Sequence, residues 1–253
     1  MKKVLFCLPI LVLALSACKK DDAVQAPSCR VLQSQYSLNG VSYAASQYEF
    51  DGSGRLSTMV FSNQASTYNY QYTYYPDSVV LAQVNQRTVY YLNAQGLAAS
   101  ATMVTSGFPA SGMRTDYTYT YNFQGYLVAD RAILTQYVGG VPRYDTSSTS
   151  YTIENGNITR MQSSDGNDYR YSYTGLPLTY NIPEFNPFLS NRGEFLGRKP
   201  ANIVSEMNIN SGLYMESYSY TSGADNRVTE KTVTRSNAPT SPPIKIAIAY
   251  QCN

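Results

Sequence analysis

Tyrosine and polar residues alternate with a period of two along much of the chain. The clearest run reads Tyr-Asn-Tyr-Gln-Tyr-Thr-Tyr over residues 68–74, and similar runs occupy residues 117–123, 169–173 and 218–220. Successive side chains of a β-strand point to opposite faces of the sheet, so each run places its rings on one face and its polar groups on the other. Tyr and Thr are also favoured in strands, and the pattern therefore predicts an all-β protein.

Turn signals separate these runs at short intervals. Asn39-Gly40 lies between two short strand-like runs, which is a strong β-hairpin signature. Short strands joined by tight turns predict an antiparallel meander. We expect this meander to curl into a barrel or half-barrel, with a two-sheet β-sandwich as the alternative. Further turn signals are Asp51-Gly52-Ser53-Gly54, Gly139-Gly140, Asn155-Gly156 and Asp165-Gly166.

A weak repeat runs through several turn regions. Its clearest copy is Tyr-x-Phe-Asp-x-x-Gly-Arg-Leu at residues 48–56, and residues 119–127 match it with Asn in place of Asp. Degenerate or stretched copies begin at Tyr91, Tyr151 and Tyr218. Each unit predicts a strand, a tight turn and the start of the next strand. The Asp or Asn side chain caps the turn, and Gly supplies a positive φ.

One segment breaks the alternation. Residues 174–201 hold four of the twelve Pro residues and lack a strand pattern. The sequence predicts a long excursion from the sheet here, with a short helix near residues 188–195. Long loops of this kind are often functional or act as packed plugs. Strands resume near Asn202, and after a Pro-rich loop at 236–243 the final strand covers residues 244–250.

The N-terminus has the features of a secretory signal. Two Lys residues precede an apolar stretch at residues 4–15, which is too short to span a bilayer. The following Leu-Ser-Ala-Cys resembles a bacterial lipobox, in which Cys18 is acylated after cleavage before it. We therefore predict a lipoprotein signal peptide at 1–17, a lipid-anchored tether at 18–28 and one all-β domain at 29–253. The alternative is an ordinary cleaved signal with a chance Cys.

The tether begins with a short charged tract. Lys19, Lys20, Asp21 and Asp22 resemble the surface-export signal that follows the lipid-bearing Cys in Bacteroidota lipoproteins. This resemblance implies attachment to the outer membrane, with the chain displayed on the cell surface. Attachment at the periplasmic face is the alternative.

Two cysteines remain once the signal and the lipidated Cys18 are set aside. Cys29 opens the predicted domain and Cys252 nearly closes the chain. An oxidising compartment favours a disulfide between them, provided that the first and last strands are neighbours. A loop of this length would be worth roughly 4–5 kcal/mol in the chain-entropy description. Two unpaired buried thiols are the alternative.

Charge and composition exclude several classes of function. Cleavage before Cys18 removes two Lys and no acid, so the formal charge falls from +2 to zero (17 basic minus 17 acidic residues). A neutral chain without a basic block argues against a nucleic-acid partner. The chain contains no His, which excludes Ser-His-Asp and Cys-His nucleophile systems and any zinc site that uses His. No phosphate-binding Gly loop or dinucleotide fingerprint occurs either, so we expect no cofactor.

The remaining catalytic option is a pair of carboxylates, as in glycosidases. Glu184 and Glu194 are the candidates of most interest because they lie in the irregular segment. Turn capping and solvated strand faces explain most acids, so we expect no enzyme. Residues 165–168 could offer oxygen ligands to Ca²⁺, but a hairpin turn explains them better. Residues 77–79 (Asp-Ser-Val) resemble a site of O-glycan attachment.

The tyrosine stripes have two interpretations. They fill the apolar face of a curved sheet or barrel, or they form an exposed row that stacks on sugars or peptides. Alternation on nearly every strand favours the first. A transmembrane barrel is disfavoured, because the residues between the tyrosines are polar and form no lipid-facing band.

Several segments together resemble a family of Bacteroidota lipoproteins of unknown function with a porin-like antiparallel β fold. They are the lipobox, the charged tether, the repeat units, residues 195–202 and the closing Ala-Tyr-Gln-Cys at 249–252. The repeat units also resemble the Tyr-Asp repeats of large bacterial shell-forming proteins. The resemblance implies a fold and a location, and no catalytic residue.

These observations give three hypotheses for function. The first is a non-catalytic lipoprotein that is held at the membrane by its lipid and binds a glycan, a peptide or another nutrient. The second is an envelope-structural protein without a small ligand. The third is a polysaccharide hydrolase that uses paired carboxylates.

Overall fold

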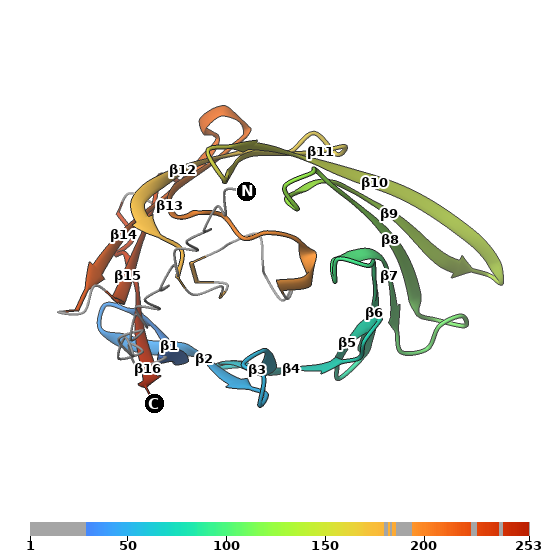
Figure 1. Ribbon diagram of the computed structural model, residues 1–253, viewed down its shortest axis with the longest axis horizontal. Helices are drawn as coiled ribbons and strands as arrows, with labels where there is room; N and C mark the ends of the chain where they lie inside the picture. The colour runs from blue at the N-terminus through green and yellow to red at the C-terminus, as the bar shows by residue number, and fades with distance from the viewer. Residues whose placement is uncertain are drawn as a thin grey trace, which may run out of the picture.

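The computed structural model describes residues 29–179, 182, 184–185, 194–223, 227–237 and 240–252. Within them the chain forms a closed barrel in which sixteen strands follow one another in sequence order (Figure 1). Every neighbouring pair is antiparallel, so the predicted meander is confirmed and closes fully, and the sandwich alternative is wrong. The strands are β1 (Cys29–Leu38), β2 (Val41–Phe50), β3 (Leu56–Asn63), β4 (Thr67–Tyr74), β5 (Ser78–Gln83), β6 (Gln86–Leu92), β7 (Ala98–Thr105), β8 (Met113–Tyr121), β9 (Leu127–Val138), β10 (Val141–Glu154), β11 (Asn157–Ser163), β12 (Asp168–Pro177), β13 (Asn202–Ile209), β14 (Tyr214–Ser222), β15 (Val228–Arg235) and β16 (Ile244–Cys252).

The barrel is closed by the first and last strands. β1 pairs with β16 from Cys29 opposite Cys252 to Leu38 opposite Ile244. A disulfide joins Cys29 to Cys252 at one end of this seam. Closure leaves none of the sixteen described strands as a free sheet edge, which removes a common route to aggregation.

The two mouths of the barrel differ in their turns. One mouth, here called the tether mouth, holds Cys29, Cys252 and the turns that follow even-numbered strands. Asp51 lies in its first turn, where Oδ1 accepts hydrogen bonds from the backbone N–H groups of Ser53 and Arg55, both at 2.9 Å. Asn93 and Asn122 cap two further turns there in the same way. The opposite end, the far mouth, holds the turns that follow odd-numbered strands.

The tyrosine stripes face the interior. Tyr72, Tyr171 and Tyr218 are buried, and the residues that alternate with them face outward. Several tyrosine hydroxyls also satisfy a backbone carbonyl near the start of the neighbouring strand, which the sequence pattern did not reveal. These pairs are Tyr74 to Leu56 (3.0 Å), Tyr121 to Ala98 (2.8 Å), Tyr173 to Ile158 (2.6 Å), Tyr220 to Val204 (2.6 Å) and Tyr250 to Val228 (2.6 Å).

The irregular segment enters the barrel (Figure 1). Leu178, Ile182 and Phe185 are buried in a cluster with wall residues of β1, β2, β13 and β16. Phe195 and Leu196 pack in a second cluster against β4 to β7. The described part of this excursion therefore packs inside the barrel against two parts of the wall, and we call it the plug.

Two details of the segment differ from expectation. β12 continues to Pro177, so the strand ends later than the predicted start of the excursion at 174. Of the helix expected near 188–195, residues 188–193 lie outside the described residues. The described end is the three-residue 3-10 helix η2 (Glu194–Leu196).

The outer wall is polar and charged. Arg131 and Arg160 lie in the middle of their strands and Arg170 near the start of β12, all on the face opposite to the tyrosines. A transmembrane barrel needs an apolar band at this height, because charges that face lipid are strongly destabilising. At these positions the described outer wall carries charged side chains in place of an apolar band. No helix in the described part of the chain is long and apolar enough to cross a membrane.

Candidate functional site

A buried polar cluster joins the plug to the barrel wall. Glu184 of the plug is only 3% exposed. Its Oε1 accepts hydrogen bonds from the hydroxyls of Tyr36 on β1, at 2.8 Å, and Tyr48 on β2, at 2.6 Å. Burial, followed by the charge of Glu184, raises the pKa of both tyrosines well above the ordinary value, so both remain hydrogen-bond donors at neutral pH.

Lys231 of β15 approaches the same segment from the opposite side of the seam. It is 7% exposed, and its Nζ donates a 2.7 Å hydrogen bond to the backbone carbonyl of Glu184. The ammonium also lies 3.9 Å from the centre of the Tyr218 ring, a cation–π contact. Burial lowers the pKa of Lys231 to about 8, although the charges of Glu184 and Glu216 act in the opposite direction. We name Tyr36, Tyr48, Glu184, Tyr218 and Lys231 the anchor cluster.

A second carboxylate extends this cluster along β14. Glu216 accepts hydrogen bonds from the hydroxyls of Tyr214 and Tyr218, the latter at 2.8 Å, and from Arg235 Nε at 2.9 Å. Burial alone would raise the pKa of Glu216, but these three hydrogen bonds outweigh it and hold the pKa below its usual value. Glu216 therefore stays ionised inside the barrel.

The anchor cluster holds the plug against the barrel wall. Buried charges persist only where partners replace their hydration, and every polar group of Glu184 described above has such a partner. The carboxylate is enclosed between the plug and the wall, so it is not placed to meet a polymeric substrate. The cluster holds the plug by hydrogen bonds from three strands, β1, β2 and β15.

Removal of the Glu184 carboxylate is expected to loosen the plug. In Glu184→Ala, Tyr36 and Tyr48 lose their buried acceptor, and Lys231 loses a nearby negative charge. We expect the free energy of unfolding to fall by about 3 kcal/mol. Urea unfolding followed by circular dichroism measures the change. Glu49→Ala, on the outer face of β2, is the matched control and should cost less than about 0.5 kcal/mol; equal losses in the two variants would contradict the fastening role.

A hollow of about 610 Å³ lies on the wall formed by β8 to β11. Short hydroxyl side chains form most of it, and Arg131 and Gln162 add longer polar groups. The strand register places Thr118 beside Arg131 and Arg131 beside Ser148, so outward-facing groups of three strands meet in one row. The lining residues are Thr118, Thr120, Ala129, Asp130, Arg131, Ser148, Thr149, Ser150, Gln162, Ser163 and Ser164.

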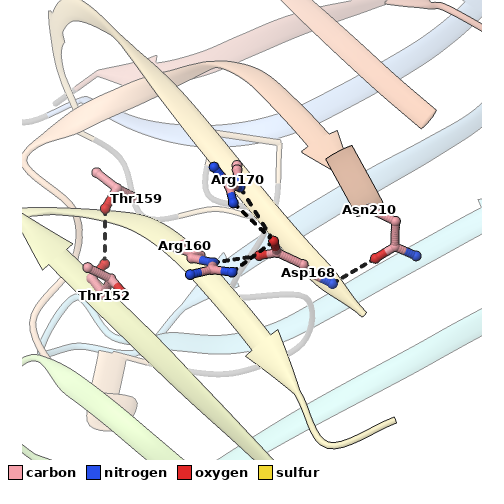
Figure 2. A network of polar contacts seen from close by, with 6 residues as sticks. All are labelled: Thr152, Thr159, Arg160, Asp168, Arg170 and Asn210. Atoms are coloured by element: carbon pink, nitrogen blue, oxygen red, sulfur yellow. Dashed lines mark hydrogen bonds and ion pairs between the residues drawn. The ribbon is translucent and has the colours of Figure 1, made fainter. Parts of the chain in front are cut away.

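A charged network lies on β11 and β12 (Figure 2). It adjoins the hollow, because Gln162 of the hollow is paired with Asp168 of the network. Asp168 accepts hydrogen bonds from Arg160 Nε at 2.7 Å and, more loosely, from Arg170 Nε at 3.4 Å. These partners hold the pKa of Asp168 below its usual value. The backbone N–H of Asp168 donates to Asn210 Oδ1 at 2.8 Å, which ties β12 to the turn after β13.

The candidate calcium segment is a hairpin turn in the structure. Asp165 Oδ1 accepts the backbone N–H of Asn167 at 3.2 Å, while Asp168 is occupied by the two arginines. Among the described residues no group of three acidic or Cys side chains is arranged to hold a metal ion.

The other candidate residues lie on an exposed turn or outside the described part of the chain. Ser78 Oγ donates to Asp77 Oδ1 at 3.0 Å on an exposed turn, where both remain accessible. Glu194 begins η2, and its side chain lies outside the described residues, as do Cys18 and the charged tract at 19–22. Sequence reasoning singled out Glu184 but missed Lys231, because nothing local to β15 signals a lysine that faces inward.

A closed antiparallel barrel with a chain segment packed inside it and a polar outer wall defines the class of structure. Comparison with protein-family models finds no match, and a search of the curated proteins finds none either. Two solved structures are similar to the chain. One is a porin-like protein from Bacteroides uniformis (TM-score 0.59, 14% identity, 88% of this chain and 96% of that chain). The other is a porin-like protein from Bacteroides vulgatus (TM-score 0.57, 14% identity, 88% and 99%).

These similarities establish a shared fold over nearly the whole barrel. The porin-like fold that the sequence resemblance implied is therefore confirmed for this chain. Identity of 14% carries no information on ligand or activity, which must come from the residues themselves.

Proposed function

We propose that the protein is a plugged, lipid-anchored barrel of the outer membrane whose outer wall faces water and binds a glycan without catalysis. The observation that carries this proposal is the inversion of polarity relative to a membrane-spanning barrel. Tyrosines and aliphatic residues fill the interior with the plug, while Arg, Ser and Thr cover the exterior. Such a barrel requires a separate means of membrane attachment, and the lipobox at Cys18 supplies one.

The hollow on β8 to β11 supports the choice of ligand. A polyhydroxylated ligand exchanges hydrogen bonds with Ser and Thr hydroxyls, and a planar guanidinium such as that of Arg131 can donate two at once. Tyr91 of β6 adds a ring that is 50% exposed. The register aligns Tyr91 with Ser100, and Ser100 with Thr118 in the hollow, about 10 Å away at two strand spacings. The apolar face of a sugar ring packs well on such an aromatic ring.

Glycan binding is tested with the purified full chain on a polysaccharide array, followed by calorimetry on the best ligand. Arg131→Ala should weaken binding at least tenfold, about 1.4 kcal/mol. Lys245→Ala, an exposed residue of β16, is the matched control and should bind as wild type. Equal affinity of wild type and Arg131→Ala would overturn the assignment of the hollow.

Anchoring and display are tested in cells. Radioactive palmitate should label the wild type and not Cys18→Ala, which should leave the membrane fraction. Protease added to intact cells should digest the wild type and spare a variant in which residues 19–22 are all Ala. Protection of the wild type, with digestion in lysed cells, would place the protein on the periplasmic face.

An envelope-structural role is the second candidate. The packing of the described plug residues against the wall and the covalently closed seam favour it, because both give a rigid body. Failure of every glycan to bind would move this role ahead. A hydrolase is not supported by Glu184, because wall tyrosines enclose its carboxylate.

A further inference from the structure

The far mouth of the barrel carries apolar side chains at positions where turns are usually polar. Leu38 and Val41 flank the turn between β1 and β2, and Val138 and Val141 flank the turn between β9 and β10. Val84 lies in the β5–β6 turn, and Leu213 precedes β14. These six side chains, here called the apolar rim, are between 40% and 82% exposed.

The tether mouth is different in character. Its turns are built on Asp51, Asn93 and Asn122, whose side chains cap the backbone. Among the described residues of its turns, Tyr75 and Phe123 are the large exposed apolar ones, and each stands alone in its turn. The apolar rim therefore belongs to one end of the barrel.

From this asymmetry we infer that the apolar rim inserts into the surface of a lipid bilayer. The rim residues come from four separate hairpins around one mouth, and the β9–β10 hairpin reaches outward from the wall (Figure 1). A protein partner would need a matching pocket for each tip. A bilayer surface accepts apolar side chains at any lateral position, so it fits dispersed tips without further complementarity.

The length of the predicted tether permits this orientation. Residues 18–28 precede β1 and can span up to about 36 Å. β1 itself has ten residues and so covers about 33 Å along its own axis, and less along the barrel axis because strands tilt. A lipid on Cys18 can thus reach the bilayer that contacts the far mouth, even though the tether begins at the other mouth. The inference rests on the proposed lipid anchor only for this argument about the reach of the tether.

The test measures which mouth meets the bilayer. In the lipidated protein Cys18 is acylated and Cys29 is bonded to Cys252, so Val141→Cys or Phe123→Cys would add a single free thiol. Each thiol receives an environment-sensitive fluorophore, and the protein is reconstituted on vesicles of phosphatidylcholine and phosphatidylethanolamine that contain nitroxide-labelled lipid. We expect the label at residue 141 to be quenched at least threefold more than the label at residue 123. Val138→Ser in the Val141→Cys background should reduce this quenching, because it replaces an apolar side chain of the same hairpin with a polar one.

Other results would overturn the inference. Equal weak quenching at both positions would leave the rim in water, and stronger quenching at residue 123 would place the tether mouth on the bilayer. A label at residue 141 that is shielded without vesicles, and more so at high protein concentration, would assign the rim to a second copy of the chain. If the proposed lipid anchor is wrong but the rim inference is right, palmitate labelling would be lost while the label at residue 141 remained quenched. The two failures can therefore be distinguished.

Discussion

Raising the pH above about 10 is expected to unfold the barrel abruptly. Burial raises the pKa of Tyr48, Tyr72, Tyr171 and Tyr218 well above the ordinary tyrosine value of 10.0. Below pH 10 these hydroxyls are protonated in both states, so they add no pH dependence. Above pH 10 the unfolded chain loses protons that the barrel retains, and stability falls as the pH rises.

The size of this effect is large relative to the stability of a folded domain. Each such tyrosine costs about 1.4 kcal/mol per pH unit above 10, so these four together cost about 5–6 kcal/mol per unit. A typical domain has only about 5–15 kcal/mol in total. Lys231 acts in the opposite direction, because its pKa is lowered to about 8. Its titration raises stability by at most about 3.5 kcal/mol between pH 8 and 10.5, which is too little to compensate.

Two signals recorded in one titration test this expectation. Tyrosinate absorbance should rise first for exposed rings and then jump together with the loss of circular dichroism. Tyr72→Phe should remove one of the linked protons and make the loss of stability with pH less steep. Smooth ionisation of all tyrosines near pH 10, with circular dichroism unchanged, would show that the stripes are open to water.

Loss of the Cys29–Cys252 bond is expected to have the second large effect. The bond joins residues separated by 223 positions, so it constrains nearly the whole unfolded chain. The chain-entropy description assigns about 5 kcal/mol to a loop of this length. The bond also fastens the one seam of the barrel whose strands are not consecutive in sequence, so its removal should expose β1 and β16 first.

Denaturant unfolding of the wild type and of Cys29→Ser/Cys252→Ser measures the change. Wild type treated with reductant is the matched control and should coincide with the double variant. Hydrogen exchange should show faster exchange in β1 and β16 than in β8 and β9, which lie far from the seam. Coincidence of the oxidised and double-variant curves would show that strand pairing alone maintains closure.

Local features of the chain were determined by the sequence. The period of two in residues 68–74 and 117–123 depends only on the alternation of side chains along a strand, so it predicts which residues share a face. The Asn39-Gly40 and Asp51–Gly54 turns also follow from local preferences, and both occur as expected. The porin-like fold was predicted from the resemblance to a lipoprotein family, to which the repeat units contribute.

Only the tertiary structure decided what these faces enclose. Glu184 contacts Tyr36, which is 148 positions away in the sequence, and Lys231, which is 47 positions away. Local sequence patterns do not predict contacts between residues so far apart in the chain. Strand number and closure determine these contacts, because they set which faces meet inside the barrel. The same closure places the turns of odd-numbered strands at one mouth, where Val84 and Val141 become part of one rim. Alternation fixes the side of a residue on its strand, whereas its partners are set by the global path of the chain.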